Sequence, residues 1–320
     1  MIGRTMLAQR CKLIFNPAAA QGKAAGRLAE VEALLRARGI DYELHLTKAV
    51  GHAIELAREA AREGFSTLAS AGGDGTTNEV INGLMAADAR GDTIPALAVL
   101  GIGRGNDFEY GAGLPSSLAE SVGLLAAGSS RLVDVGLVTG GDYPRGRYFG
   151  NGIGIGFDTI VGLAAAKMRR VHGFMGYVLG ALRTMAVYPE APEVTVAFDS
   201  RILGQRSHQI SIMNGKRMGG TFYMAPSADI RDGLLDLCMA ESLTRREMLG
   251  LVVRYTKGTQ ATHPKVRTER SSRFEVLAPA GGLVVHADGE TICTNGTNIV
   301  AECLGSKLRL LCADEGAPVS

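Results

Sequence analysis

The fold of this chain is decided around Ser70-Ala71-Gly72-Gly73-Asp74-Gly75-Thr76-Thr77-Asn78-Glu79. An apolar run, residues 65–71, precedes this stretch and a helical pattern, residues 78–87, follows it, so the chain passes from a strand to a helix here. Glycines at positions 72, 73 and 75 let a ligand approach the main chain closely. Because the free N–H groups of a helix start attract an anion, we expect a phosphate-binding turn. The alternative is a glycine-rich connection that binds nothing.

Asp74 is the unusual residue of this turn. A carboxylate next to a phosphate makes physical sense only if a metal ion, its water shell or a proton transfer lies between the two groups. The side chains of Thr76, Thr77 and Asn78 are of the types that cap helices, and we expect them to cap the helix that follows.

The first 135 residues alternate between strand and helix patterns. Strands are expected at 12–15, 40–46, 65–71 and 95–100, and helices at 28–39, 51–62, 78–87 and 116–126. This alternation predicts an α/β domain over residues 1–135, with a doubly wound parallel sheet covered on both faces. Ligands of such sheets bind beyond the carboxyl ends of the strands, where Asn16, Thr47, Asp74 and the segment 103–107 fall.

The pattern changes after Val133. Two helical stretches, 159–170 and 174–188, come before a series of short β-rich runs, which one further helix at 245–255 interrupts. The expected strands lie at 193–198, 208–213, 234–240, 274–278, 283–286, 298–303 and 308–312. Closely spaced short strands predict an antiparallel β-sandwich domain over residues 136–320, whose last residues can return to the first domain.

Composition narrows the class of protein. The formal net charge of the 320 residues is only +2, which argues against a nucleic-acid partner. The five cysteines are odd in number and have no zinc-site spacing, which favours a reduced, cytoplasmic chain. No signal peptide and no apolar run of about 18 residues is found, so we expect no membrane span.

Three further acidic segments carry candidate chemistry. The first, Gly103-Arg104-Gly105-Asn106-Asp107-Phe108, follows the strand next to the glycine-rich turn, so Asp107 is expected near Asp74. The second, residues 229–236, offers carboxylate and main-chain oxygens that suit Mg²⁺, although a simple β-turn explains it equally well. In the third, residues 286–290, a carboxylate at a strand end is a candidate general base, and a hairpin with solvated acids is the alternative.

Several nucleotide and hydrolase motifs are absent. The chain has no GxxxxGK[ST] phosphate loop, no HExxH, no GxSxG and none of the protein-kinase signatures. Residues 152–156, Gly-Ile-Gly-Ile-Gly, have half of a dinucleotide fingerprint but no suitable unit around them. We interpret them as a closely packed strand.

Taken together, the motifs resemble those of the diacylglycerol kinase catalytic family, which includes bacterial lipid kinases, sphingosine kinases and ceramide kinases. The resemblance runs in order from about residue 10 to residue 312. It rests on Phe15-Asn16-Pro17, Thr47 with Gly51-His52-Ala53, the segment 72–84, Gly105-Asn106-Asp107-Phe108, Asn151-Gly152-Ile153-Gly154, Asp232-Gly233-Leu234-Leu235-Asp236 and Asp288-Gly289-Glu290.

The resemblance implies an N-terminal domain of the phosphofructokinase and NAD-kinase type, a C-terminal β-sandwich, and ATP bound between them. It implies nucleotide contacts from Asn16, Thr47, Asp107 and the turn made of Gly72, Gly73, Asp74, Gly75, Thr76, Thr77 and Asn78. Asp74 and Asp107 would act on catalytic Mg²⁺ through water. A structural Mg²⁺ would be held by Asp232 with the carbonyls of Asp229 and Leu234. Asp288 would be the catalytic base, with Glu290 beside it and Asp74 as the rival base.

One position departs from the family pattern. Bacterial lipid kinases commonly have Gly-Thr-Gly/Ala-Asn-Asp where this chain has Gly103-Arg104-Gly105-Asn106-Asp107. Arginine therefore replaces a threonine that would help to hold the nucleotide. A guanidinium group can instead meet a phosphate by charge.

The resemblance implies an ATP-dependent lipid kinase that takes its acceptor from a membrane, with contact at the inner membrane face and a homodimer as further expectations. Basic residues (Lys167, Arg169, Arg170, Arg183) flank the apolar stretch 174–182, which suits an acyl pocket, an anionic surface or simply a core helix. The alternatives are a soluble-substrate kinase like NAD kinase, which shares the GGDGT motif, and a catalytically silent lipid- or nucleotide-binding protein.

Overall fold

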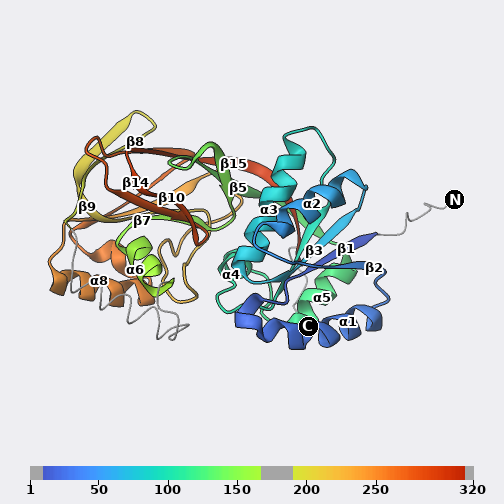
Figure 1. Ribbon diagram of the computed structural model, residues 1–320. Helices are drawn as coiled ribbons and strands as arrows, with labels where there is room; N and C mark the ends of the chain where they lie inside the picture. Colours follow the sequence, from blue (N-terminus) through green and yellow to red (C-terminus); the bar gives the residue numbers. More distant parts are fainter. Residues whose placement is uncertain (1–9, 167–189, 314–320) are drawn as a thin grey trace. The chain divides into compact units, whose positions relative to one another are not determined.

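The computed structural model describes residues 10–166 and 190–313 (Figure 1). The chain divides into two compact units. The first contains the described residues up to Val133 and those from Ser306 onward, and the second contains Asp134–Gly305. The C-terminal end of the described chain therefore belongs to the first unit.

The first unit is built on a parallel sheet with the strand order β2-β1-β3-β4-β15. Its strands are β1 (Cys11–Phe15), β2 (Tyr42–Leu46), β3 (Thr67–Gly72), β4 (Ala96–Gly101) and the end of β15 (Asn298–Leu311). Its helices are η1 (Ala19–Arg27), α1 (Leu28–Ala37), α2 (His52–Arg62), α3 (Asp74–Asp88), α4 (Asp107–Gly111) and α5 (Leu118–Ala127). Helices α1 and α5 lie on one face of the sheet, and α2 and α3 lie on the other (Figure 1).

The carboxyl ends of these strands are level with one another. Phe15 is paired with both Leu46 and Ala71, and Gly72 is paired with Gly101. The segments that follow β1, β2, β3 and β4 therefore emerge at the same edge of the sheet. This edge carries the residues that the sequence placed at strand ends.

The second unit is a two-sheet β-structure. One sheet has the order β14-β13-β7-β9-β10-β11, and the other joins β9, β8, β12 and β15, with β5 paired to β15 and β6 paired to β5. The strands are β5 (Ser130–Gly140), β6 (Tyr143–Phe149), β7 (Gly152–Gly156), β8 (Glu193–Phe198), β9 (Arg201–Met213), β10 (Leu235–Glu241), β11 (Val266–Ser271), β12 (Arg273–Leu277), β13 (Leu283–Ala287) and β14 (Glu290–Gly296). Strand β9 joins both sheets, because residues 201–206 pair with β8 and residues 207–213 pair with β10.

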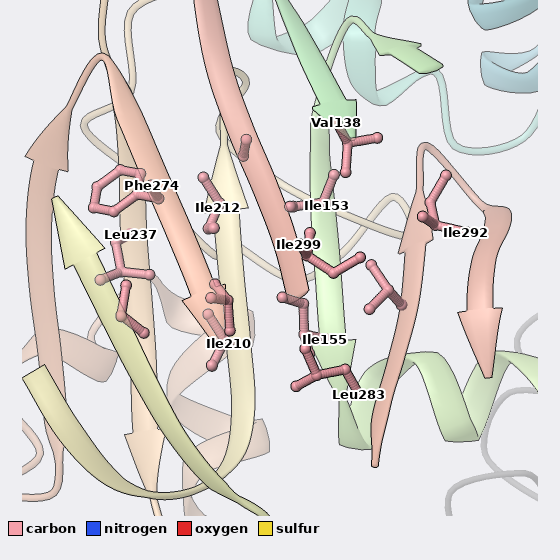
Figure 2. Close-up of a cluster of buried hydrophobic side chains, with 14 of the residues drawn as sticks. Val138, Ile153, Ile155, Ile210, Ile212, Leu237, Phe274, Leu283, Ile292 and Ile299 are labelled. Atoms are coloured by element: carbon pink, nitrogen blue, oxygen red, sulfur yellow. The ribbon is translucent and has the colours of Figure 1, made fainter. Parts of the chain in front are cut away.

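The core of this unit draws side chains from both sheets. Ile153, Ile210 and Ile212 of the first sheet belong to one buried cluster with Phe274 and Ile299 of the second (Figure 2). Because alternate residues of each strand point into this cluster, its strands follow the hydrophobic alternation that the sequence shows. The expected fold class, a parallel α/β domain and an antiparallel sandwich, is confirmed.

The described helices of the second unit are α6 (Phe157–Ala166), α8 (Arg245–Lys257) and the short η2 (Gln260–Thr262). A capping box starts α8: the Glu247 amide donates to Thr244 Oγ1, and the Glu247 carboxylate accepts from the Thr244 amide. The expected helix at 174–188 and the basic and apolar residues between 167 and 183 lie outside the described residues. Within residues 10–166 and 190–313, no helix is both long enough and apolar enough to cross a bilayer.

The structure corrects the expected start of helix α3. The helix begins at Asp74, four residues earlier than expected, with Gly73 in an extended conformation as its N-cap residue and no side-chain cap. Thr76, Thr77 and Asn78 lie buried within the first turns, so the expectation that they cap this helix is wrong. The first amides of α3 therefore have no side-chain partner, which leaves them available to an anion.

The strands that sequence periodicity missed are β5, β6, β11 and β14, and the two expected strands near the C-terminus form the single strand β15. Strand β11 illustrates the reason: it reads Val-Arg-Thr-Glu-Arg-Ser, and only its two end residues are buried. A strand with so few buried residues gives no clear apolar alternation.

Candidate active site

Glycines after the neighbouring strands β3 and β4 of the first unit allow the main chains of the two turns to touch. A Cβ atom on Gly103 would lie 2.4 Å from Gly73 Cα, and a Cβ atom on Gly72 would lie 2.3 Å from Thr76 Oγ1. Such distances leave no room for a side chain. The turn after β3 and the turn after β4 are therefore in direct contact through glycine.

The carboxylate of Asp74 ties these turns together. Its Oδ1 accepts hydrogen bonds from the amides of Asp107 (2.5 Å) and Phe108 (3.2 Å), which start helix α4. An anion at that position also stabilises a helix N-terminus. Its Oδ2 accepts no hydrogen bond from the described residues and lies next to Gly105. One oxygen of Asp74 thus holds the fold, while the other remains available to a ligand.

Asp107 and Asp74 converge on one point. A Cβ atom on Gly105 would be 2.8 Å from Asp74 Oδ2 and 3.5 Å from Asp107 Oδ2. Asn106, which takes a left-handed conformation at φ 50°, has a buried Oδ1 without a hydrogen-bond partner among the described residues. Two carboxylates and an unsatisfied buried amide oxygen thus lie beside the uncapped start of α3, an arrangement that fits nucleotide phosphates with their Mg²⁺.

The remaining predicted nucleotide contacts divide into buried and open positions. Asn16 Nδ2 donates to Thr76 Oγ1 (2.9 Å), and the hydroxyls of Ser70 and Thr77 are 3.3 Å apart, so these side chains hold the turn to the sheet. Asn78 is also buried. Thr47 follows β2 at the same edge, and its amide donates to the Phe15 carbonyl (2.9 Å). Gly75 is exposed, and a Cβ atom there would have no neighbour within 4 Å.

Arg104 and Glu79 show what sequence reasoning could and could not find. Arg104 is exposed, and its guanidinium has no partner among residues 10–166 and 190–313, which suits a group that meets a ligand. Glu79, to which the sequence motifs assign no role, accepts hydrogen bonds from the amides of Gly51 (2.8 Å) and Ala53 (3.1 Å) at the start of α2. It fixes the helix that follows the Thr47 segment, and only its place in the GGDGTTNE stretch signalled it.

A second acidic turn lies in the second unit, between β13 and β14. Asp288 takes a left-handed conformation at φ 46°. Its carboxylate accepts hydrogen bonds from the amides of Gly150 (2.7 Å), Asn151 (3.1 Å) and Gly152 (2.9 Å). A carboxylate has about four lone-pair positions, so these three amides occupy most of its capacity. Asp288 therefore anchors the segment that leads into β7.

Glu290 differs from Asp288 in its bonding. Its half-buried carboxylate has no hydrogen bond or ion pair within the part of the chain that the structure describes. Of the two acids in the Asp288-Gly289-Glu290 turn, Glu290 is the one whose oxygens are not already used by the fold.

A hydrogen-bond network links this turn to the Asp232-Gly233-Leu234 segment. Asn214 Nδ2 donates to the carbonyls of Gly150 (2.8 Å) and Asp134 (3.1 Å), and Asp134 Oδ2 accepts the Gly233 amide (2.7 Å). Sequence reasoning missed both Asn214 and Asp134. Both act through contacts with residues far away in the sequence, so no local signal pointed to them.

The side-chain carboxylates of the 229–236 segment are paired with arginines. Asp229 forms an ion pair with Arg231 (3.0 Å), and Asp232 contacts Arg270, whose Nε also lies 3.5 Å from Asp236 Oδ1. Asp232 Oδ1 accepts the Leu234 amide as well (2.9 Å). No group of three His, Cys, Asp or Glu side chains in the described residues could hold a metal. The Asp232 carboxylate, the side chain expected to hold a structural Mg²⁺, thus has the Arg270 guanidinium as its counter-ion in this structure.

We predict that Arg270 stabilises this segment without a metal. The melting temperature of the wild-type protein should be the same in Mg²⁺ and in EDTA. Arg270→Ala should lower it by about 2–4 °C, since a partly exposed ion pair contributes up to about 1 kcal/mol. Arg267→Ala, an exposed position on the same strand without a partner among the described residues, is the matched control. A wild-type protein that EDTA destabilises would contradict this prediction.

An apolar cavity of about 500 Å³, counted with its open side, lies within the second unit. It is lined by Phe157, Met218, Phe222, Met224, Met248, Val252 and Tyr255, with Asp158 and Gln209 as its polar members. Methionine side chains adapt to irregular apolar ligands. The cavity is thus suited to a flexible hydrocarbon chain.

Comparison with known proteins places the chain in a family. Residues 10–138 match the diacylglycerol kinase catalytic domain, and residues 151–312 match the YegS C-terminal NAD kinase beta sandwich-like domain. The lipid kinase YegS of Escherichia coli K12 and the probable lipid kinase YegS of Shigella flexneri are each 31% identical over 290 residues, which cover 88% of this chain and 90% of the relative.

Solved structures show the same fold. A diacylglycerol kinase from Bacillus anthracis superposes with a TM-score of 0.71 at 20% identity, covering 95% of this chain and 97% of that one. Yeast NADH kinase superposes with a TM-score of 0.52 at 9% identity, covering 97% and 85%. The chain therefore belongs to the lipid kinase family of YegS, in which a diacylglycerol kinase catalytic domain precedes a β-sandwich domain, and it is a kinase.

Proposed function

We propose that this kinase transfers the γ-phosphoryl group of ATP to a hydroxyl group of a diacylglycerol-like or related lipid. The convergence of Asp74 and Asp107 beside the uncapped start of α3 carries the phosphoryl-transfer part of the proposal. The relatives named as lipid kinases and the apolar cavity of the second unit support a lipid acceptor.

The chain supplies positioning and charge, which are what phosphoryl transfer needs most. The amides of residues 74–76 and the exposed Arg104 guanidinium would hold the phosphates. Asp74 Oδ2 and Asp107 would hold Mg²⁺ through water, and the ion would neutralise charge on the phosphates. In the transfer, the acceptor oxygen forms a bond to the γ-phosphorus, and the bond from that phosphorus to the ADP oxygen breaks.

The hydroxyl proton must pass to a base as this bond forms. The resemblance implied Asp288, but its oxygens already accept three backbone amides. We assign the proton to Glu290, which accepts no hydrogen bond within residues 10–166 and 190–313, and we assign to Asp288 the support of the segment before β7. Asp74 Oδ2 is the rival, since it is open as well.

The acceptor lipid would come from a membrane, and its acyl chain would enter the cavity lined by α8. Contact with the inner membrane face, a cytoplasmic location and a homodimer stay predictions, and the basic residues on which the membrane contact rests lie outside the described residues.

The experiment that tests this proposal is incubation of the protein with γ-labelled ATP and Mg²⁺ and a panel of acceptors. The panel holds diacylglycerol, ceramide, a sphingoid base, phosphatidylglycerol and NAD, and an Asp74→Ala protein is the control. We expect label in one or more lipids with the wild-type protein only. Label in NAD alone would indicate a soluble-substrate kinase, and label in no acceptor would indicate a catalytically silent binding protein.

A further inference from the structure

Helix α8 packs on the second unit with one of its faces. Its inward side chains Met248, Leu251 and Tyr255 are buried and belong to one apolar cluster with Met213 of β9 and Cys238 of β10. The helix lies at the lower border of the second unit in Figure 1. The buried face explains where α8 lies in the fold, but it does not explain the residues on the opposite face.

The opposite face of α8 carries large apolar side chains that are exposed. Leu249 is 54% exposed and Val253 is 53% exposed. The two residues are four positions apart, so their side chains are neighbours on the helix surface. Among the described residues of the second unit, Ile202 is the only other large apolar side chain that is exposed. Single exposed apolar residues are ordinary, whereas an adjacent pair on one helix face favours a contact surface.

Two cations flank this apolar pair on the same face of α8. Four residues, spaced by three, four and four positions, form one stripe along the helix: Arg246, Leu249, Val253 and Lys257. We call this set the α8 stripe. Arg246 and Lys257 are exposed and have no ion pair or hydrogen bond within residues 10–166 and 190–313. The α8 stripe therefore has an apolar centre and a positive charge at each end.

The acidic residue of α8 leaves this positive charge in place. Glu247 forms an ion pair with Lys265 (2.8 Å) and takes part in the capping box at the start of the helix. Its charge is therefore matched by a lysine that does not belong to α8. Arg254 is held beside the stripe, because its Nη1 donates a hydrogen bond to Thr262 Oγ1 (2.6 Å).

An apolar centre between two cations is a pattern that binds to an anionic bilayer surface. Apolar side chains enter the boundary of the acyl chains, and Lys and Arg side chains meet the charged head groups. We propose that the α8 stripe docks the protein on an anionic membrane. A second copy of the chain fits this surface less well, because a two-fold contact of the stripe with itself brings Arg246 of one copy to Lys257 of the other. This inference rests on the proposed function, since it gives the membrane-derived acceptor lipid its point of contact.

Docking at α8 brings the bilayer close to the apolar cavity of the second unit. The side of the helix away from the stripe contributes Met248, Val252 and Tyr255 to the wall of that cavity. A helix with its side chains is about 10 Å across, so one helix separates the bilayer from the cavity wall. A lipid acceptor then leaves the membrane at the element that lines its cavity.

Equilibrium binding to vesicles tests the charged part of the stripe. Sedimentation measures binding, without ATP, to vesicles of phosphatidylcholine with about one-third phosphatidylserine and to vesicles of phosphatidylcholine alone. We expect the wild-type protein to prefer the anionic vesicles, and this preference to weaken at high salt. Arg246→Gln combined with Lys257→Gln should weaken binding to the anionic vesicles about 25-fold, because each cation near such a surface contributes about five-fold.

The apolar part of the stripe is tested separately. Leu249→Gln combined with Val253→Gln should weaken vesicle binding about ten-fold or more, because two apolar side chains no longer enter the bilayer. Ile202→Gln on β9 and Arg145→Gln on β6, which change exposed residues of the same unit, are the matched controls and should bind like wild type. Equal melting temperatures of all these variants without vesicles confirm that they fold.

A fluorescent reporter locates the contact directly. The chain has no tryptophan, so Leu249→Trp introduces a single one in the stripe. We expect its emission to shift to shorter wavelength on anionic vesicles and to be quenched by brominated lipid, whereas Ile202→Trp should show neither change. Emission of Leu249→Trp that stays as in water, or unchanged vesicle binding of both double variants, would overturn the proposal. So would a dimer in solution that dissociates in Leu249→Gln combined with Val253→Gln, because the stripe would then bind a second copy.

Vesicle binding keeps this proposal distinct from the proposed function. If the protein phosphorylates a lipid in detergent micelles but its vesicle binding does not depend on the α8 stripe, the kinase assignment stands and the docking role fails. If vesicle binding depends on the stripe but no lipid is phosphorylated, the docking role stands and the assignment to a lipid acceptor fails.

Discussion

Gly103→Ala should lower the rate of phosphoryl transfer by about 100-fold and destabilise the first unit by about 1–3 kcal/mol. A Cβ atom at this position would lie 2.4 Å from Gly73 Cα, so the turns after β3 and β4 must separate. Overpacking of this kind typically costs about 1–3 kcal/mol, and a displacement of about 1 Å near the reacting groups can cost about 100-fold in rate. Thermal unfolding and initial-rate measurements check the two effects.

Gly75→Ala is the matched control for Gly103→Ala. The residue is exposed in the first turn of α3, and a Cβ atom there would have no neighbour within 4 Å. Stability should therefore be unchanged or slightly higher, because alanine favours a helix over glycine. If the backbone of this turn approaches ATP, the KM for ATP rises in Gly75→Ala without loss of stability. Equal stability of Gly103→Ala and wild type would contradict the close contact of the two turns.

Asp288→Ala should destabilise the second unit by about 2–4 kcal/mol and abolish activity. The change leaves the buried amides of Gly150, Asn151 and Gly152 without their acceptor, and a buried donor without a partner costs about 1–3 kcal/mol. Asp288→Asn, which keeps one oxygen acceptor and a residue type that tolerates positive φ, should lose less stability. Calorimetry and circular dichroism melting measure the loss.

Glu290→Gln separates the supporting role from the proton-accepting role. Its side chain has no hydrogen bond within the described residues, so we expect unchanged stability, together with a fall in kcat of about 100-fold or more, a typical contribution of general base catalysis. If Glu290→Gln keeps full kcat while Asp288→Asn is stable but inactive, then Asp288 is the general base. If Glu290→Gln and Asp288→Asn both keep the wild-type kcat, then Asp74 is the remaining candidate base.

Local patterns were sufficient for most of the parallel domain. The apolar run before Gly72 and the periodic segments around it predicted the strands and helices, and strand order then placed Asp74 and Asp107 at neighbouring strand ends, where the structure brings them together. The start of α3 was misplaced because Gly73, rather than a hydroxyl or amide side chain, occupies the N-cap position. The statistical preference for polar N-cap residues therefore fails at this helix.

Long-range contacts account for what the sequence did not reveal. Arg270 lies more than thirty residues after the acidic segment 229–236 and contacts Asp232 because β11 pairs with β10. Strand β11 has too little apolar alternation to be recognised from the sequence. Asp158 follows an apolar strand as Asp74 does, so the same signal was present. The contacts of Asp158 depend on His286 and Gly154, which lie beside it only because β13 pairs with β7.

Mass spectrometry of the lipid recovered after incubation with ATP and Mg²⁺ tests the central claim, that this chain is an ATP-dependent lipid kinase, most directly. We predict that the wild-type protein converts an acceptor lipid to its phosphomonoester, and that Gly103→Ala forms about 100-fold less of this product in the same time. Unchanged lipid in every arm, or a phosphorylated lipid formed equally by wild type and Gly103→Ala, would contradict it.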